Sequence, residues 1–262
     1  MGRFWIAVLA GLLCGLAGAA ELRLGATHTL EDSGILPVLV GAFEAAHGIK
    51  VRALVAGTGQ VMKYAENGDV DVVFTHSRID EEKLVASGIG RRRRDVMWND
   101  FVIAGPASDP ARIRGMRDAA VALKRIRDSG ARFVSRGDDS GTHKAELRLW
   151  SAAGGLAPWP GYLSAGQGAG RALLMAFELD AYDLVDRATL RKYERRAPLP
   201  VLVEGDARLL NEYGVTTIIA SAARGANERD AEIFAAWLAS PAARKLIEGL
   251  RIEGERAFHL PR

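Results

Sequence analysis

Three segments of the sequence have the composition of a small-anion site: glycines and hydroxyl side chains between a predicted strand and a predicted helix. They are residues 25–34, residues 56–60 and residues 135–142. The first turn of a helix carries unpartnered backbone N–H groups and the positive end of the helix dipole, so it favours an anion. Serine and threonine hydroxyls add neutral donors, and Arg136 in the third segment adds a permanent planar charge. These residue types predict anion binding.

Two other interpretations of these segments are open. Ser, Thr and Asp cap helices in most proteins, so any one segment taken alone is consistent with a structural role. We expect Asp138 and Asp139 to cap the following helix and to orient Arg136 from behind. The order Asp139-Ser140-Gly141 also permits a serine nucleophile, with His28 or His143 as base. The helical pattern after Thr142 argues against an all-β protease, and the nucleophile elbow of α/β-hydrolases is missing from the sequence.

The elements that must position these segments alternate along the chain. Strand-like runs are predicted at 22–24, 51–55, 70–75, 101–104, 132–135, 200–203 and 215–220. Helical spacing of apolar residues is found at 35–46, 60–67 and 143–153, and two consecutive helices are predicted at 228–239 and 241–250. Such alternation predicts an α/β fold with mostly parallel sheets, whose ligands bind at the carboxyl ends of the strands.

Composition and the N-terminal segment narrow the class of protein. The 262 residues are 48% hydrophobic and 26% charged with a net charge of +3, which excludes a disordered polymer and gives no reason to expect nucleic-acid binding. Residues 1–20 combine Arg3, an apolar run and small residues, which predicts a signal peptide cleaved near Ala20; the alternative is a membrane anchor. Cys14 lies in this segment, so the mature chain would have no disulfide, thiolate metal site or cysteine nucleophile.

One long motif resembles the signature of the periplasmic tungstate-binding proteins of ABC transporters. It is the run SRGDDSGTHKAEL at residues 135–147. Shorter matches occur in the same order along nearly all of the mature chain. They are DSGIL at 32–36, GTGQ at 57–60, GDVDV at 68–72, NDFVIAGP at 99–106, GQGAG at 166–170 and LVEGD at 202–206.

The resemblance implies a type II periplasmic binding protein: two α/β lobes, a central cleft and a hinge of two crossovers. Lobe one would be residues 21–101 and 205–262, and lobe two residues 102–204. The chain would be a monomeric periplasmic protein that captures a tetrahedral oxyanion, tungstate first and molybdate second, and delivers it to a membrane permease. We expect no catalytic step, cofactor or protein-bound metal, since the tungsten oxyanion would be held through its oxygens. The alternatives are a binder or sensor of sulfate or phosphate, and a secreted serine hydrolase using Ser140 or Ser33.

The resemblance also assigns the ligand residues. Arg136 would be the charge partner of the oxyanion. The other candidates are Ser140, Gly141 and Thr142 beside it, with Thr27, His28, Thr29 and Thr58 opposite. The first loop departs from the family pattern, which has a run of threonines followed by a serine where this chain reads Ala26-Thr27-His28-Thr29-Leu30. We therefore expect His28 to line the cleft and, when protonated, to strengthen the binding of a dianion.

The sequence contains one conspicuous charged segment, the four-arginine run at residues 91–94. We expect it to form a solvated loop between elements. The alternative is a docking site for acidic residues of a transporter or for anionic lipid.

Overall fold

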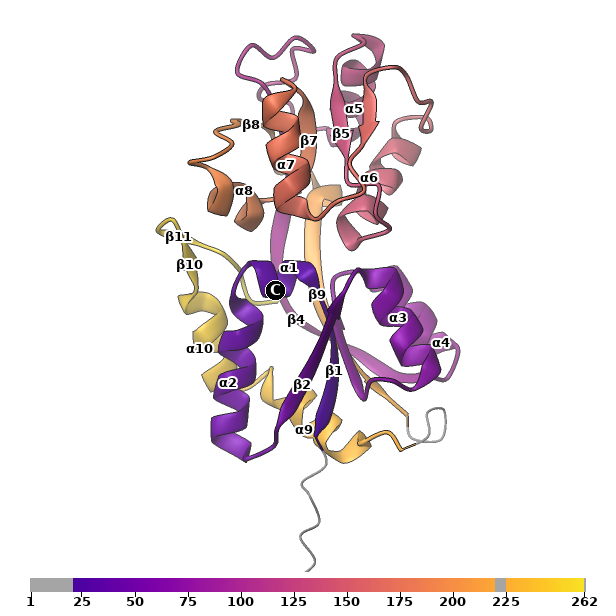
Figure 1. The fold of residues 1–262 in the computed structure, drawn as a ribbon, viewed down its shortest axis with the longest axis vertical. Coiled ribbons are helices and arrows are strands. Elements are labelled where there is room, and N and C mark those ends of the chain that lie inside the picture. Colours follow the sequence, from indigo (N-terminus) through magenta and orange to yellow (C-terminus); the bar gives the residue numbers. More distant parts are fainter. Residues whose placement is uncertain (1–20, 220–224, 262) are drawn as a thin grey trace, which may run out of the picture.

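The computed structural model describes residues 21–219 and 225–261. The predicted signal peptide, its cleavage site and Cys14 lie outside these residues. Figure 1 shows two α/β lobes, one above the other, joined by two long strands that run between them.

The lower lobe in Figure 1 begins with three strands, each followed by helix. Its elements are β1 (Leu22–Thr27), α1 (His28–Asp32), α2 (Ile35–His47), β2 (Val51–Ala56), α3 (Thr58–Asn67), β3 (Val72–Thr75) and α4 (Arg78–Ala86). β1 lies between β2 and β3 and is parallel to both. Leu22, Leu24 and Ala26 of β1 are fully buried, as expected for a strand covered by helices.

The upper lobe repeats this alternation around β5. Its elements are α5 (Ala119–Asp128), β5 (Phe133–Ser135), α6 (Gly141–Ala152), β6 (Tyr162–Ser164), α7 (Ala169–Glu178), β7 (Tyr182–Asp186), α8 (Arg187–Tyr193), β8 (Val201–Val203) and the 3-10 turn η1 (Ala207–Leu209). β5 lies between β6 and β7 and is parallel to both.

Two long strands, β4 (Gly90–Ala104) and β9 (Leu210–Ile218), connect the lobes. β4 pairs with β9 as far as Asp100 and with β7 from Phe101 onward. After β9 the chain stays on the lower lobe in α9 (Glu228–Trp237), α10 (Pro241–Gly249) and the hairpin of β10 (Arg251–Ile252) and β11 (Glu255–Arg256). Ser240 caps α10, and Pro241 occupies its first turn, where no N–H partner is needed.

Each lobe has its own hydrophobic core. In the lower lobe, Phe43 of α2 packs edge-on against Phe234 of α9, with ring centroids 4.9 Å apart. In the upper lobe, Trp150 of α6 packs edge-on against Phe133 of β5 at 5.6 Å. Within the described residues, we find no helix with the length and apolarity needed to cross a membrane.

The α/β prediction is confirmed, but the prediction of mostly parallel sheets is wrong. β3, β7 and β8 each meet a crossover strand in antiparallel pairing, and β4 and β9 are antiparallel to each other. The crossover strands carry the chain from one lobe to the other and back, so each must run against its neighbours. The local spacing of apolar residues does not predict that the chain crosses between the lobes twice in opposite directions.

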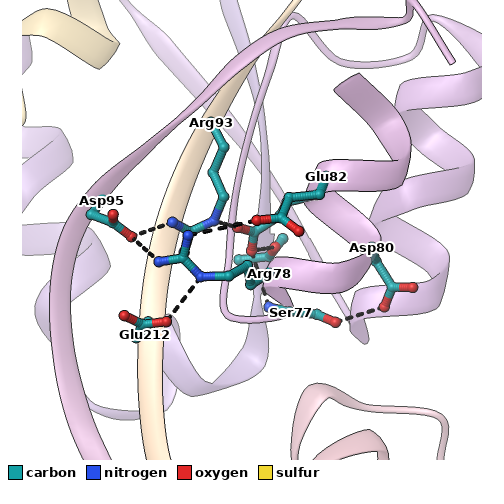
Figure 2. Close-up of polar contacts among 9 residues, drawn as sticks. Ser77, Arg78, Asp80, Glu82, Arg93, Asp95 and Glu212 are labelled. Carbon is teal, nitrogen blue, oxygen red and sulfur yellow. Dashed lines mark hydrogen bonds and ion pairs between the residues drawn. The ribbon is translucent and has the colours of Figure 1, made fainter. Parts of the chain in front are cut away.

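The prediction that the four-arginine run is a solvated loop is also wrong, because Arg91–Arg94 lie within β4. Arg93 is almost fully buried and contacts Glu81 of α4 and Asp95. Arg94 contacts Glu232 of α9. Figure 2 shows Arg78 completing this cluster, 3.0 Å from Glu212 and 2.8 Å from Asp95. Arg93 and Arg94 are therefore neutralised inside the lower lobe by the neighbouring Asp95 and by acids of α4 and α9, while Arg91 and Arg92 are exposed.

Candidate oxyanion-binding site

A small pocket lies between the lobes, at the helix N-termini that follow the strands. Seven of the eight predicted ligand residues line it: Thr27, His28, Thr29, Thr58, Arg136, Ser140 and Gly141. Thr142, the eighth, follows directly in α6. The pocket is also lined by Ala56 and Gly57, which lie in the predicted segment 56–60, and by His76, which lies outside all three predicted segments. The structure thus brings the predicted residues together, while their contact with a ligand stays a prediction.

The first wall of the pocket is the junction of β1 and α1. Thr27 ends the strand, and its hydroxyl lies 3.1 Å from the hydroxyl of Thr29. Both threonines are buried, whereas His28 between them is exposed at the rim. The pair places two hydroxyl groups beside the pocket, and the Thr29 hydroxyl also hydrogen-bonds to that of Tyr213.

The second wall is the junction of β2 and α3. Gly57 has the extended backbone of an N-cap and places Thr58 in the first turn of the ten-residue helix. The Thr58 side chain is fully buried, and its Oγ1 has no hydrogen-bond partner. A buried hydroxyl without a partner costs free energy, so native structures rarely keep one unless something binds there.

The third wall is the junction of β5 and α6 in the other lobe. Arg136 is 3% exposed, donates through Nε to the Gln167 carbonyl at 2.9 Å and contacts Asp138. Asp138 also accepts the Ser140 amide at 3.1 Å, so it orients Arg136 from behind, as predicted. Ser140, and not an aspartate, caps α6, by accepting the His143 amide at 3.3 Å.

Thr142 gives the third wall a counterpart of Thr58. Its Oγ1 is buried and has no hydrogen-bond partner. The two unpartnered threonine hydroxyls therefore lie in the first turns of α3 and α6, one in each lobe. This symmetry supports a ligand that accepts hydrogen bonds from both lobes at once.

His76, at the end of β3, is the main residue that the sequence analysis missed. Its ring is buried, and Nδ1 lies 2.9 Å from Oδ1 of Asn211. Burial lowers the pKa of His76, the Asn211 hydrogen bond opposes this effect, and the nearby charges of Arg136 and Arg148 add to it, so that the pKa lies at about 4. The imidazole is therefore neutral at neutral pH. Its position after a strand that is parallel to β1 was the signal that could have identified it.

The lobes also contact each other beside the pocket. Lys144 of α6 lies 2.8 Å from Asp80 of α4, and Asp139 packs against Gly59 of α3. Burial alone would raise the pKa of Asp80, but hydrogen bonds from Lys144 and Ser77 outweigh it and hold the pKa below its usual range. On the other side, Lys192 of α8 contacts the Asp32 carbonyl. These contacts hold the lobes together around the pocket.

The chemistry of the pocket is that of an anion receptor. Three helix N-termini, neutral hydroxyls and one guanidinium converge, and the residues lining the pocket include no carboxylate. Among the described residues, no cluster of His, Cys, Asp and Glu could hold a metal ion. The donors fit a compact, fully deprotonated oxyanion that carries more than one acceptor oxygen.

Two α/β lobes joined by two strands around an anion pocket define the class of PBP-type binding proteins, and the PBP superfamily domain matches residues 17–242. Tungstate-binding protein TupA of Peptoclostridium acidaminophilum is 40% identical over 229 residues, which are 87% of this chain and 80% of that protein. The chain belongs to the PBP superfamily and, within it, to the family of the TupA proteins.

Two solved structures agree with this assignment. TupA from Desulfovibrio alaskensis G20 is 38% identical, with a TM-score of 0.81 over 92% of this chain and 98% of that one. The tungstate ABC transporter structure from Geobacter sulfurreducens is 42% identical, with a TM-score of 0.79 over 88% and 98%. The predicted type II binding-protein fold and the family resemblance are confirmed.

Proposed function

We propose that this chain is an extracytoplasmic binding protein that captures tungstate, with molybdate as the second choice, for an ABC transporter. The observation that carries the proposal is the pair of buried, unpartnered hydroxyls of Thr58 and Thr142 on facing helix N-termini, next to the buried guanidinium of Arg136. A tetrahedral oxyanion between the lobes would satisfy all three groups. The relatives named for tungstate binding support the choice of ligand.

The chemistry of the pocket also favours some oxyanions over others. Tungstate, molybdate and sulfate are fully deprotonated at neutral pH, whereas phosphate is still partly protonated and needs an acceptor for its proton. The residues that line the pocket offer no carboxylate for that purpose. Phosphate is therefore the weakest of the four ligands in this proposal, and sulfate is the competitor to be distinguished by size.

Ligand binding is tested by isothermal titration of the mature chain with tungstate, using molybdate, sulfate and phosphate as competitors. We expect submicromolar tungstate binding and weak competition by sulfate and phosphate. Absence of binding to all four anions would contradict the proposal. Sulfate binding as tight as tungstate would contradict the choice of ligand only, and the Thr27-His28-Thr29 loop would be the first segment to examine.

The proposal includes no catalytic step. The Ser140 hydroxyl accepts the His143 amide, and the Ser33 hydroxyl donates to the Leu30 carbonyl at 3.1 Å, so both candidate nucleophiles are engaged with backbone. A serine-reactive probe should label neither residue. Covalent labelling of Ser140 that tungstate prevents would favour the hydrolase alternative.

We further propose that the mature protein starts after Ala20, is monomeric in the periplasm, and has lobes that follow the boundaries 21–101 with 205–262 and 102–204. N-terminal sequencing of the secreted protein and sedimentation velocity test the first two statements. Cleavage elsewhere, or a dimer at micromolar concentration, would contradict them.

A further inference from the structure

The ring of His76 lies directly against Gly141 on the opposite lobe. A Cβ atom placed on Gly141 would lie 2.5 Å from Cε1, 2.8 Å from Nδ1 and 2.9 Å from Nε2 of the ring. Carbon atoms do not approach ring atoms this closely, so no side chain fits at residue 141 while the lobes are in this arrangement. Gly141 is the first residue of α6, whose N-terminus forms part of the pocket.

The ring itself is held by the two crossover strands. Nδ2 of Asn211 donates to Oδ1 of Asn99 at 2.7 Å and to the Tyr213 hydroxyl at 3.2 Å, so Oδ1 of Asn211 faces His76 and accepts the proton of Nδ1. Asn211 in β9 and Asn99 in β4 are paired across the crossover. The Tyr213 ring supports the imidazole, with centroids 5.0 Å apart. All four residues are buried.

We propose that His76 is a positioning residue for oxyanion capture. Its ring, held by Asn211 and Asn99 of the crossover strands, is the stop against which the N-terminus of α6 comes to rest when the lobes close. It thereby sets the spacing between Arg136 with α6 on one side and Thr27 with Thr58 on the other. This inference rests on the proposed function. A ligand bridged by two walls needs both at hydrogen-bond distance, so an error of about 0.5 Å in that spacing is enough to weaken binding.

The test changes the space available between residue 141 and the His76 ring. Gly141→Ala adds one methyl group at the ring, and we expect tungstate affinity to fall by about tenfold or more, with an unchanged melting temperature of the ligand-free protein. Gly168→Ala is the matched control, because Gly168 precedes α7 in the same lobe and nothing lies within 4 Å of the added atom. The double variant Gly141→Ala/His76→Ala should regain affinity over Gly141→Ala, since the ring that blocks closure is gone.

A second variant tests whether the hydrogen bond to Asn211 positions the His76 ring. Asn211→Val removes the acceptor for Nδ1 but keeps the ring and a strand-compatible side chain. We expect a loss of affinity of a few fold and the disappearance of the hydrogen-bonded Nδ1 proton signal of His76 in NMR spectra. An unchanged affinity in Asn211→Val would overturn the role of the crossover pair.

The outcomes separate this inference from the proposed function. The inference is wrong if Gly141→Ala binds tungstate as tightly as the wild type. It is also wrong if the double variant binds as weakly as Gly141→Ala, because Gly141 would then act through its own contact with the ligand. If the wild type binds none of the four oxyanions, the proposed function fails and small-angle scattering of the ligand-free proteins decides the inference. Gly141→Ala should then have a larger radius of gyration than Gly168→Ala. Equal radii of gyration would show that the His76 ring does not limit the approach of α6.

Discussion

The two lobes contribute different chemistry to the pocket. The lower lobe supplies neutral donors: the hydroxyls of Thr27, Thr29 and Thr58, and the N-termini of α1 and α3. The upper lobe supplies neutral donors as well, in Ser140, Thr142 and the N-terminus of α6, and it adds Arg136, the one permanently charged side chain among the residues that line the pocket. A permanent charge attracts any anion, whereas neutral donors at fixed positions bind best an anion whose size and geometry match their spacing. We therefore expect Arg136 of the upper lobe to contribute most to affinity and the donors of the lower lobe to contribute most to the choice among oxyanions.

The strongest test of this division is Arg136→Ala. The loss of a charged hydrogen bond is worth about 1.5–3 kcal/mol, which corresponds to about a 10- to 150-fold weaker affinity. If the guanidinium acts by charge, tungstate, molybdate and any measurable sulfate binding should weaken by similar factors in isothermal titration. Arg125→Ala, on the exposed side of α5, is the control. Near-native affinity of Arg136→Ala would remove Arg136 from the site.

Thr58→Val and Thr142→Val compare the two walls directly, because each removes one unpartnered hydroxyl at nearly constant volume. Each hydrogen bond to the ligand is worth about 0.5–1.5 kcal/mol, so each variant should bind tungstate about 2- to 13-fold more weakly. Only Thr58→Val, in the lower lobe, should also change the ratio of tungstate to molybdate affinity.

Thermal melting without ligand supplies the second measurement for this pair. Since neither hydroxyl has a partner in the protein, both valine variants should be at least as stable as the wild type. A clear loss of stability in either variant would show that its hydroxyl supports the fold. In that case the lower affinity could not be assigned to a missing ligand contact.

A smaller effect is expected from the ion pair that joins the lobes. Lys144→Met and Asp80→Asn each remove the contact between α6 and α4, and partly exposed pairs are worth about 0.2–1 kcal/mol. Tungstate affinity should fall by up to about fivefold, with no further loss in the double variant. Lys124→Met breaks an ion pair within α5 and is the control. Additive losses would mean that the two residues act separately.

Local motifs in the sequence were enough to predict most of the residues that line the candidate pocket. Arg136, Ser140 and Thr142 lie within one short segment, and the glycine and hydroxyl pattern at Thr58 marks a helix start in any fold. His76 was missed because its importance depends on Gly141 of the other lobe and on Asn211, which is 135 residues away. No local pattern connects such distant residues.

The same limit explains the wrong assignment of the four-arginine run. Four consecutive basic residues followed by a single acid, Asp95, suit a solvated loop because the local sequence leaves most of their charge uncompensated. The structure supplies Glu81 from α4 and Glu232 from α9, which allow Arg93 and Arg94 to continue β4. The crossover strands likewise depend on pairing between β4 and β9, whose partners are more than a hundred residues apart. The periodicity of apolar residues predicted where strands and helices lie, but the direction of each strand depends on pairing with residues far away in the sequence.

His28 gives the smallest expected effect and the finest test of the comparison between the lobes. It lines the pocket from an exposed position at the start of α1, in the wall that is otherwise neutral. A bound dianion stabilises the protonated imidazole, so tungstate affinity should be about two- to threefold higher near pH 6 than near pH 8, the size of an exposed charge pair. His76 does not contribute in this range, because burial lowers its pKa to about 4.

Titration of the wild type and of His28→Ala at both pH values decides the question. The slope with pH should vanish in His28→Ala; a slope that persists would belong to another group, and a flat wild-type profile would mean that His28 does not face the ligand. If the slope depends on His28, the lower lobe gains a charge of its own as the pH falls. The contrast between a charged and a neutral wall would then hold fully only in mildly alkaline solution, and the choice among oxyanions should be sharpest there.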